Sequence, residues 1–187
     1  MRVIAGSARR VQLKTPAGME TRPTTDRIKE TLFNMLQPYI CECHFLDLFS
    51  GSGGIGIEAL SRGAAHAVFV DQGAEPIRCI TENLRATRLT EQAQVIKADI
   101  IAAIQQLERE QKKFDIIFMD PPYNCQWEKQ VLTYLVQSAI LDSHTMLIFE
   151  ASLDTDISYI EHLGYTIDKI KKYKTNMHVF LSRPEER

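Results

Sequence analysis

The sequence lacks the long hydrophobic runs that membrane-spanning helices require. Its apolar runs are only a few residues long, as in residues 116–119 (IIFM), whereas a helix that crosses a bilayer needs about 20 predominantly apolar residues. The first ten residues, MRVIAGSARR, also lack the apolar segment of a secretory signal peptide. We therefore expect no membrane partner and a cytoplasmic location.

Cysteine is sparse, and its spacing is not that of a metal site. The four cysteines include no C-x-x-C pair and have no histidine at zinc-finger spacing. Neither a metal nor a disulfide framework is expected, and reduced thiols fit a cytoplasmic protein. The five histidines, His178 among them, have no partnered Ser or Cys that would suggest nucleophilic catalysis, so we interpret each as structural or exposed.

The composition is that of an ordinary globular domain with an uneven charge. Of the 187 residues, 44% are hydrophobic and 25% are charged, which predicts one domain with a substantial core. Residues 1–37 carry seven basic and three acidic side chains, whereas residues 38–187 carry fifteen and twenty-one. A basic segment on an acidic body suits a polyanionic partner, because neutralising phosphates releases counterions. A merely solvated N-terminal extension would carry the same charge.

The N-terminal region is predicted to be an appendage. RVIAG and RRVQLKTP are typical of two short strands around a Gly-Ser turn. From Thr24 the apolar residues recur at helical spacing, and the helix is expected to end before Pro38. We therefore divide the chain into a basic hairpin and helix extension at 1–37 and a main domain at 38–187.

Beyond residue 38, short apolar runs alternate with helical patterns, which indicates a parallel sheet with crossover helices. The predicted strands are 45–49, 67–71, 94–97, 114–119 and 145–150, and the predicted helices are 55–62, 76–89, 100–110 and 128–140. A short helix is expected after residue 155. The last two strand-like runs, YTIDKIKKY and MHVFLSR, are joined so closely that they must pair antiparallel. The prediction is an α/β fold with a seven-stranded, mostly parallel sheet and an antiparallel last strand.

A glycine-rich loop is the first motif with chemical meaning. In FLDLFSGSGGIGIEAL, Gly51, Gly53 and Gly56 form G-x-G-x-x-G between a predicted strand and a predicted helix. Glycines let the chain turn sharply and let a ligand approach the backbone, and the helix start offers free N–H groups. The motif alone also suits a dinucleotide, and a turn without a ligand is a further alternative.

Carboxylates near this loop favour a positively charged cofactor. Asp47, four residues before Gly51, would repel a pyrophosphate but attract the sulfonium and amino groups of S-adenosylmethionine. Phe49 belongs to the same candidate site, and Asp71 suits a ribose hydroxyl pair in either kind of cofactor. Asp99 can accept a hydrogen bond from an adenine amine, although a helix cap explains it almost as well. We expect S-adenosylmethionine as the cofactor.

The strongest motif is FDIIFMDPPYN, in which Asp120, Pro121, Pro122 and Tyr123 directly follow the fourth predicted strand. Ligands bind at this carboxyl edge in open α/β sheets. The Asp120 carboxylate and the Pro121 carbonyl can accept hydrogen bonds from the exocyclic amine of a nucleobase, which would free its nitrogen lone pair to attack a methyl group. Tyr123 can stack on the base. A turn that merely ends a strand is the alternative.

These motifs, together with VFVD and KADI, resemble the Rossmann-like S-adenosylmethionine-dependent methyltransferases that act on amino groups. RVIAGSARRVQLKTP followed by TRPTTDRIKETLFNML is similar to the RsmD family, the 16S ribosomal RNA guanine-N2 methyltransferases. The resemblance spans nearly the whole chain. It implies methylation of a guanine N2 amine in 16S rRNA, within the small subunit or an assembly intermediate, with the turn at 120–123 as the catalytic site. It also implies that Arg22 and Thr24 lie near both ligands.

We further expect phosphate contacts from Arg9, Arg10 and the lysine-rich run at 169–174. A DNA adenine-N6 methyltransferase would use the same catalytic turn, but such enzymes generally need an added target-recognition region. A nicotinamide-dependent oxidoreductase would explain the glycines and Asp71, but it would give the Asp-Pro-Pro-Tyr turn no function. A non-catalytic RNA-binding module would need only the basic segment.

Overall fold

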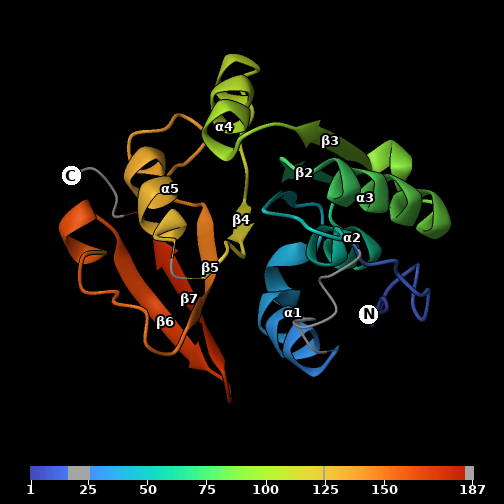
Figure 1. Ribbon diagram of the computed structural model, residues 1–187, viewed down its shortest axis with the longest axis horizontal. Helices are drawn as coiled ribbons and strands as arrows, with labels where there is room; N and C mark the ends of the chain where they lie inside the picture. The colour runs from blue at the N-terminus through green and yellow to red at the C-terminus, as the bar shows by residue number, and fades with distance from the viewer. Residues whose placement is uncertain (17–25, 124, 184–187) are drawn as a thin grey trace.

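A single sheet organises the computed structural model, which describes residues 1–16, 26–123 and 125–183. Within these residues the sheet has seven strands in the order β3-β2-β1-β4-β5-β7-β6 (Figure 1). The strands are β1 (His44–Leu48), β2 (His66–Asp71), β3 (Ala93–Lys97), β4 (Ile116–Met119), β5 (Met146–Ser152), β6 (Thr166–Lys172) and β7 (Asn176–Ser182).

The strand pairings confirm the predicted fold class. Strands β1 to β5 pair in parallel, whereas β7 pairs antiparallel with both β5 and β6. Every residue of β4 is buried, as expected for a short apolar run in a sheet covered on both faces. The chain's last strand lies inside the sheet, between β5 and β6, and it brings residues near the C-terminus beside the centre of the fold.

Helices cover both faces of the sheet (Figure 1). Helices α1, α2 and α3 contribute to one hydrophobic cluster, and α4 and α5 contribute to the other. Their bounds are α1 (Asp26–Ile40), α2 (Gly54–Ser61), α3 (Ala74–Thr87), α4 (Ile100–Arg109) and α5 (Trp127–Leu135), with 3-10 turns at η1 (Thr90–Gln92) and η2 (Glu161–Leu163). In the part of the chain that the structure describes, none of these helices is long and apolar enough to cross a bilayer.

Two helix predictions were wrong at their C-terminal ends, and a third predicted helix is not an α-helix. Helix α1 continues through Pro38 to Ile40, because Ile40 is fully buried and its packing outweighs the hydrogen bond that proline cannot make. Helix α5 ends at Leu135, five residues early. Beyond it the Ser138 hydroxyl accepts a hydrogen bond from the Ile140 N–H, which competes with helical bonding. The helix expected after residue 155 is only the turn η2.

Residues 1–16 fold back on themselves and pack against the main sheet. The expected hairpin contains one antiparallel bridge, between Arg2 and Gln12, and no regular strand among the described residues. Val3 and Leu13 are buried in the same hydrophobic cluster as α1 and the sheet strands. Residues 1–16 and α1 therefore share a hydrophobic core with the sheet.

Candidate active site

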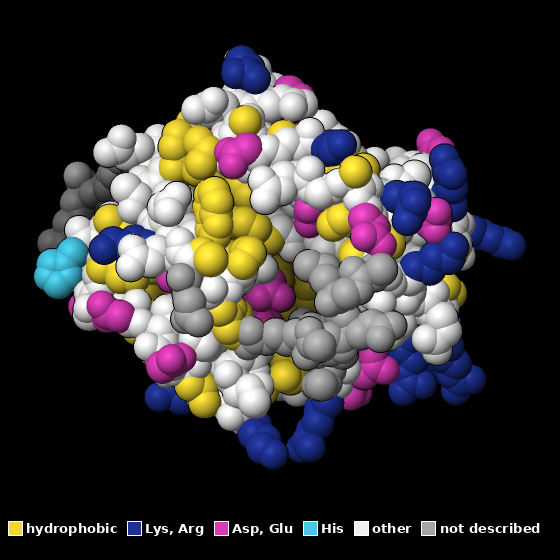
Figure 2. All heavy atoms as spheres, in the orientation of Figure 1, with side chains coloured by type: hydrophobic (Ala, Val, Ile, Leu, Met, Phe, Trp, Pro, Cys, Tyr) yellow, Lys and Arg dark blue, Asp and Glu magenta, His cyan; other side chains and the backbone are white. Residues whose placement is uncertain are grey.

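The candidate site lies where the strand order of the sheet reverses direction. Strand β1 is flanked by β2 on one side and β4 on the other, which opens a crevice at the carboxyl ends of β1 and β4. Leu48, the last residue of β1, is in register with Met119, the last residue of β4. The glycine loop and the Asp120 turn therefore leave the sheet from neighbouring positions. Figure 2 shows a hollow near the centre of the view, with hydrophobic and acidic side chains around it.

An aromatic contact joins the two segments. Phe49, directly after β1, meets Trp127, the first residue of α5, with ring centroids 6.0 Å apart in an edge-to-face arrangement. Phe49 has a positive φ of 61°, which is uncommon for a residue with a side chain. The contact brings the glycine loop against the segment that follows the Asp120 turn, as the crevice requires.

The three glycines of the loop answer different structural needs. Gly51 and Gly53 have positive φ values of 56° and 76°, which side chains adopt at a cost. Gly56 lies inside α2, where an added Cβ would come within 2.4 Å of the Phe69 ring on β2. Two glycines therefore shape the turn, and the third lets α2 pack closely on the sheet.

Asp47 is buried beneath the loop. Its side chain is 2% exposed, and its carboxylate accepts a hydrogen bond of 2.9 Å from the Gly56 N–H. Burial raises the pKa of Asp47 to about 7, the Gly56 bond opposes this, and the negative charge of Asp71 adds to it. A cation bound nearby would favour the ionised form of this carboxylate. That Asp47 attracts a cationic ligand stays a prediction.

Asp71 and Asp99 hold backbone N–H groups at the same edge. The Asp71 carboxylate accepts from Gly51 at 3.0 Å and from Gly73 at 2.8 Å, so it braces the glycine loop from the end of β2. Asp99 accepts from Ile101 at 2.9 Å and from Ala102 at 3.3 Å. The helix-cap interpretation of Asp99 is confirmed, and the ribose and adenine contacts remain predictions.

The Asp120 turn follows β4 at the position that the motif predicted. Asp120 and Tyr123 are partly buried, Pro121 is buried and Pro122 is exposed. The Tyr123 hydroxyl donates a hydrogen bond of 3.0 Å to Glu150 on β5. The ring predicted to stack on a base is therefore anchored at its far end, by a residue that the sequence analysis did not select.

Glu150 belongs to a buried polar network that joins the neighbouring strands β5 and β7. Its carboxylate also accepts from Asn176 at 2.7 Å and pairs with His178 at 3.1 Å, and His178 in turn bonds to the Tyr173 hydroxyl at 3.1 Å. His178 is fully buried, so the structural interpretation is the correct one for it. The sequence signal that could have identified Glu150 is an acidic residue within the apolar run IFEAS. Its partners depend on strand register, which the sequence does not display.

Comparison with known proteins identifies the family. A family model described as "Conserved hypothetical protein 95" matches residues 1–181. The ribosomal RNA small subunit methyltransferase D of Haemophilus influenzae is 36% identical over 155 residues, which cover 82% of this chain and 80% of that protein. The chain belongs to the RsmD family. YlbH of Bacillus subtilis is 42% identical over 157 residues, or 84% of this chain and 85% of YlbH.

Two solved structures share the fold of this chain. YhhF from Escherichia coli superposes with a TM-score of 0.85 at 28% identity, covering 100% of this chain and 99% of that one. SMU.776, solved as a complex with SAH, superposes with a TM-score of 0.68 at 15% identity, over 82% of this chain and 49% of that one. The predicted fold of S-adenosylmethionine-dependent methyltransferases is therefore confirmed.

The N-terminal segment of this family member is fastened to the elements that carry the glycine loop. Asn83 of α3 accepts from the Lys14 N–H at 2.8 Å and donates to the Ser52 carbonyl at 2.9 Å. Glu58 of α2 accepts from the N–H groups of Ile4 and Ala5 at 2.8 and 3.0 Å. Residues 4–14 are therefore joined by hydrogen bonds to the two helices that lie beside the glycine loop.

Glu58 is itself compensated inside the protein. It is fully buried and pairs with Lys29 at 3.3 Å and with Arg62 at 2.8 Å. Burial lowers the pKa of Lys29, and the charge of Glu58 opposes that effect. A buried carboxylate requires such partners. Lys29 and Arg62 therefore stabilise the carboxylate that binds the N–H groups of Ile4 and Ala5.

The predicted RNA contacts fall on two separate surfaces. Arg9 and Arg10 are exposed and follow Ala8, whose N–H donates to Ser61 at the end of α2 farthest from the glycine loop. The lysine-rich run at 169–174 begins on β6, which forms one edge of the sheet, whereas α2 packs on β1 and β2 (Figure 1). Arg22 and Thr24 lie outside the described residues.

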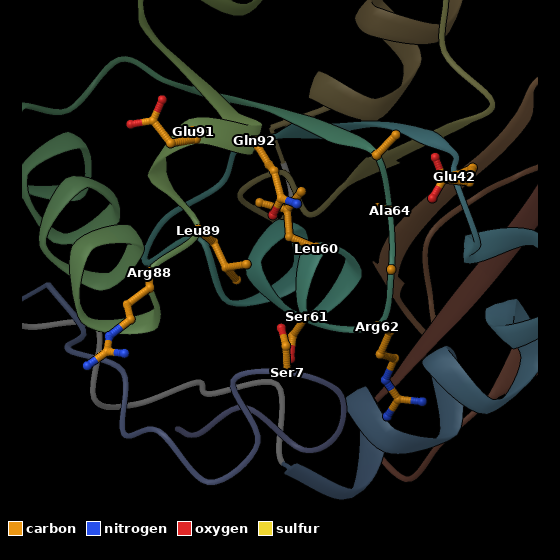
Figure 3. A pocket seen from close by; sticks show the side chains of 12 residues that line it. Ser7, Glu42, Leu60, Ser61, Arg62, Ala64, Arg88, Leu89, Glu91 and Gln92 are labelled. Carbon is orange, nitrogen blue, oxygen red and sulfur yellow. The ribbon is translucent and has the colours of Figure 1, made fainter.

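A surface depression elsewhere is not part of this site. Its lining includes Ser7, Arg62, Gly63, Arg88 and Gln92 (Figure 3). These residues precede the amino ends of β2 and β3 or lie beside them, whereas the candidate site lies at the carboxyl ends. The depression and the crevice are therefore at opposite edges of the sheet.

Proposed function

We propose that the protein transfers a methyl group from S-adenosylmethionine to the exocyclic N2 amine of a guanine in 16S rRNA of the small ribosomal subunit. One observation carries the proposal: the glycine loop after β1 and the Asp120 turn after β4 adjoin one crevice and are linked by the Phe49–Trp127 contact. Membership of the RsmD family and the names of its relatives support the choice of reaction and substrate.

The cofactor half comprises Asp47, Phe49, Gly51, Gly53 and Gly56, with Asp71 and Asp99 at the neighbouring strand ends. When bound, S-adenosylmethionine supplies a methyl group that its sulfonium already activates. Asp47 offers a negative charge to the cationic part of the cofactor, and Asp71 offers a carboxylate to the ribose hydroxyls. The SAH complex of SMU.776, a chain of the same fold, supports this choice of ligand.

The catalytic half comprises Asp120, Pro121, Pro122 and Tyr123. Asp120 and the Pro121 carbonyl accept hydrogen bonds from the guanine amine, hold it in line with the methyl group and favour a nitrogen with an available lone pair. As the N–C bond forms, the S–C bond breaks and the amine releases a proton, for which Asp120 is a suitable acceptor. Tyr123 stacks on the guanine. Alignment should supply most of the rate enhancement, since the donor is already activated.

The RNA-binding role falls to the extension at 1–37, which presents Arg9, Arg10, Arg22 and Thr24 to the substrate of the methyltransferase domain at 38–187. Arginine side chains suit this role because they bind phosphate without reading sequence. A short arm supplies little surface for sequence readout, so an assembled or assembling small subunit in the cytoplasm is the substrate that we propose.

The test is transfer of tritium from labelled S-adenosylmethionine to three purified substrates: unmodified small subunits, unmodified 16S rRNA and DNA. We expect label in the subunits, recovered as N2-methylguanine after digestion, and none with Asp120→Ala. Label recovered as N6-methyladenine in DNA would instead indicate a DNA methyltransferase. Absence of label from every substrate, with RNA binding retained, would indicate a non-catalytic RNA-binding module.

A further inference from the structure

The network around Glu150 is built around a single negative charge. Glu150 is 4% exposed, and its two oxygens receive three hydrogen bonds, from Tyr123, Asn176 and His178. Although burial raises the pKa of Glu150, the bonds and charge of His178, Tyr123 and Asn176 outweigh it and hold that pKa below its usual value. The carboxylate is therefore ionised at neutral pH and acts only as an acceptor.

The histidine connects this carboxylate to a second tyrosine. Because a carboxylate can only accept, the His178 Nε2–H donates to Glu150, while Nδ1 forms a hydrogen bond of 3.1 Å with the Tyr173 hydroxyl. Burial, with the charge of Glu150, raises the pKa of Tyr173 to about 12, so its hydroxyl stays protonated. The arrangement satisfies both ring nitrogens of His178 and fixes the orientation of the ring.

The network contacts the Asp120 turn on both sides. Phe149 on β5 is in register with Met119, so Glu150 follows at the same level as Asp120. His178 lies opposite Glu150 on β7 and packs edge-on against Phe118, two residues before Asp120, with centroids 5.9 Å apart. The Glu150–His178 pair therefore contacts β4, which precedes the turn, and Tyr123, the last residue of the turn.

We propose that Glu150, held by His178 and Asn176, is a positioning residue that fixes the Tyr123 ring as a preformed stacking surface for the guanine. The proposal rests on the proposed function. A tyrosine ring at the mouth of a crevice loses rotational freedom when it stacks, and an anchored hydroxyl removes that cost before the RNA arrives. The anchor also commits the Tyr123 hydroxyl to Glu150, so Tyr123 contributes its ring, and not a proton, to the reaction.

A double-mutant cycle tests this inference. Tyr123→Phe keeps the ring and removes the anchored hydroxyl, whereas Glu150→Gln keeps the shape and removes the charge. Each should lower kcat for methylation of small subunits about ten-fold, the expected loss of one hydrogen bond to a charged group, with the KM for S-adenosylmethionine unchanged. The double variant should be about as slow as either single one, because both changes remove the same interaction.

A matched pair in the same protein provides the control. The Tyr134 hydroxyl donates to Glu108 at 3.0 Å, between α5 and α4 and away from the crevice. Tyr134→Phe, Glu108→Gln and their double variant should leave kcat within two-fold of the wild type, even where thermal unfolding shows a loss of stability. An equal loss of kcat in this pair would overturn the positioning role, because any partly buried tyrosine–glutamate bond would then have the same effect.

Other outcomes are equally decisive. Single-variant losses that multiply in the double variant, or single variants at the wild-type rate, would overturn the proposal. If Glu150→Gln does not fold, Asn176→Ala replaces it in the cycle, since it removes another donor to the same carboxylate. A wild-type protein that labels no substrate would overturn the proposed function instead, so the two failures are distinguishable.

Discussion

The two sides of the crevice are held in place in different ways. On the cofactor side, Asp47 bonds to Gly56 and Gly51 to Asp71, so residues within one β-α-β segment shape the loop. On the catalytic side, Tyr123 is held by Glu150, and Glu150 by residues of β7 far along the chain. The geometry of the cofactor side depends on residues close together in the chain. The geometry of the catalytic side depends on the correct insertion of β7 into the sheet.

The largest effect should come from removing the carboxylate on the catalytic side. Asp120→Ala should lower kcat by about 1000-fold, as expected for loss of an orienting and proton-accepting group, while S-adenosylmethionine affinity stays within two-fold. Single-turnover kinetics and titration calorimetry measure the two quantities. Asp168→Ala, on the exposed edge strand β6, is the control. A large loss of cofactor affinity in Asp120→Ala would contradict the division of the crevice into two sides.

On the cofactor side, alanine at Gly56 should affect stability most. The added Cβ would meet the Phe69 ring at 2.4 Å, so Gly56→Ala should lower the free energy of unfolding by about 1–3 kcal/mol, as overpacking does. At Gly51 a Cβ meets nothing within 4 Å, and the cost should be about 1 kcal/mol, from the positive φ alone. Urea unfolding of both variants, with Phe69→Leu as a rescue of Gly56→Ala, checks the order.

Asp47 should show opposite effects on stability and on binding. Its folded pKa of about 7 lies above the ordinary value, so its contribution to stability is present at low pH and is lost as the pH rises through 7. Asp47→Asn should therefore stabilise the ligand-free protein by about 1–3 kcal/mol at pH 8 and much less at pH 4. The same variant should bind S-adenosylmethionine more weakly at pH 8. Equal stabilisation at both pH values would refute the raised pKa.

The smallest effect should come from the basic arm. Arg9→Gln with Arg10→Gln should raise the KM for small subunits only several-fold and should reduce the slope of log Kd against log salt by about 1 to 2. Cofactor affinity should not change, because these side chains lie at the far end of α2. Arg109→Gln, at the exposed end of α4, is the matched control, and a salt slope unchanged in the double variant would exclude the arm from phosphate contacts.

Much of the fold could be predicted because its signals are local. Short apolar strands, the glycine pattern and the Asp-Pro-Pro-Tyr turn each occupy a few consecutive residues, and the rule for parallel sheets places them at one edge. The element ends were harder. Pro38 argued for an earlier end of α1, and only the burial of Ile40 shows why the helix continues.

The candidate site was predictable to the same extent. Asp47 lies within β1, Asp71 ends β2 and Asp120 follows β4, as the motifs predicted. Asp99 caps its helix, as the alternative interpretation required. Glu150 and His178 could not be paired in advance, since 28 residues separate them and their contact exists only through the β5–β7 register.

The sequence by itself determined the order of strands and helices, the glycine turn and the position of the carboxylate-proline turn, because hydrophobic periodicity and backbone restrictions act over a few residues. Only the tertiary structure decided that β7 enters between β5 and β6, that the N-terminal segment is fastened to α2 and α3, and that a buried Glu–His pair anchors Tyr123. Those contacts join residues distant in the chain, and their energy arises only when the sheet has assembled and excluded water from the polar groups it brings together.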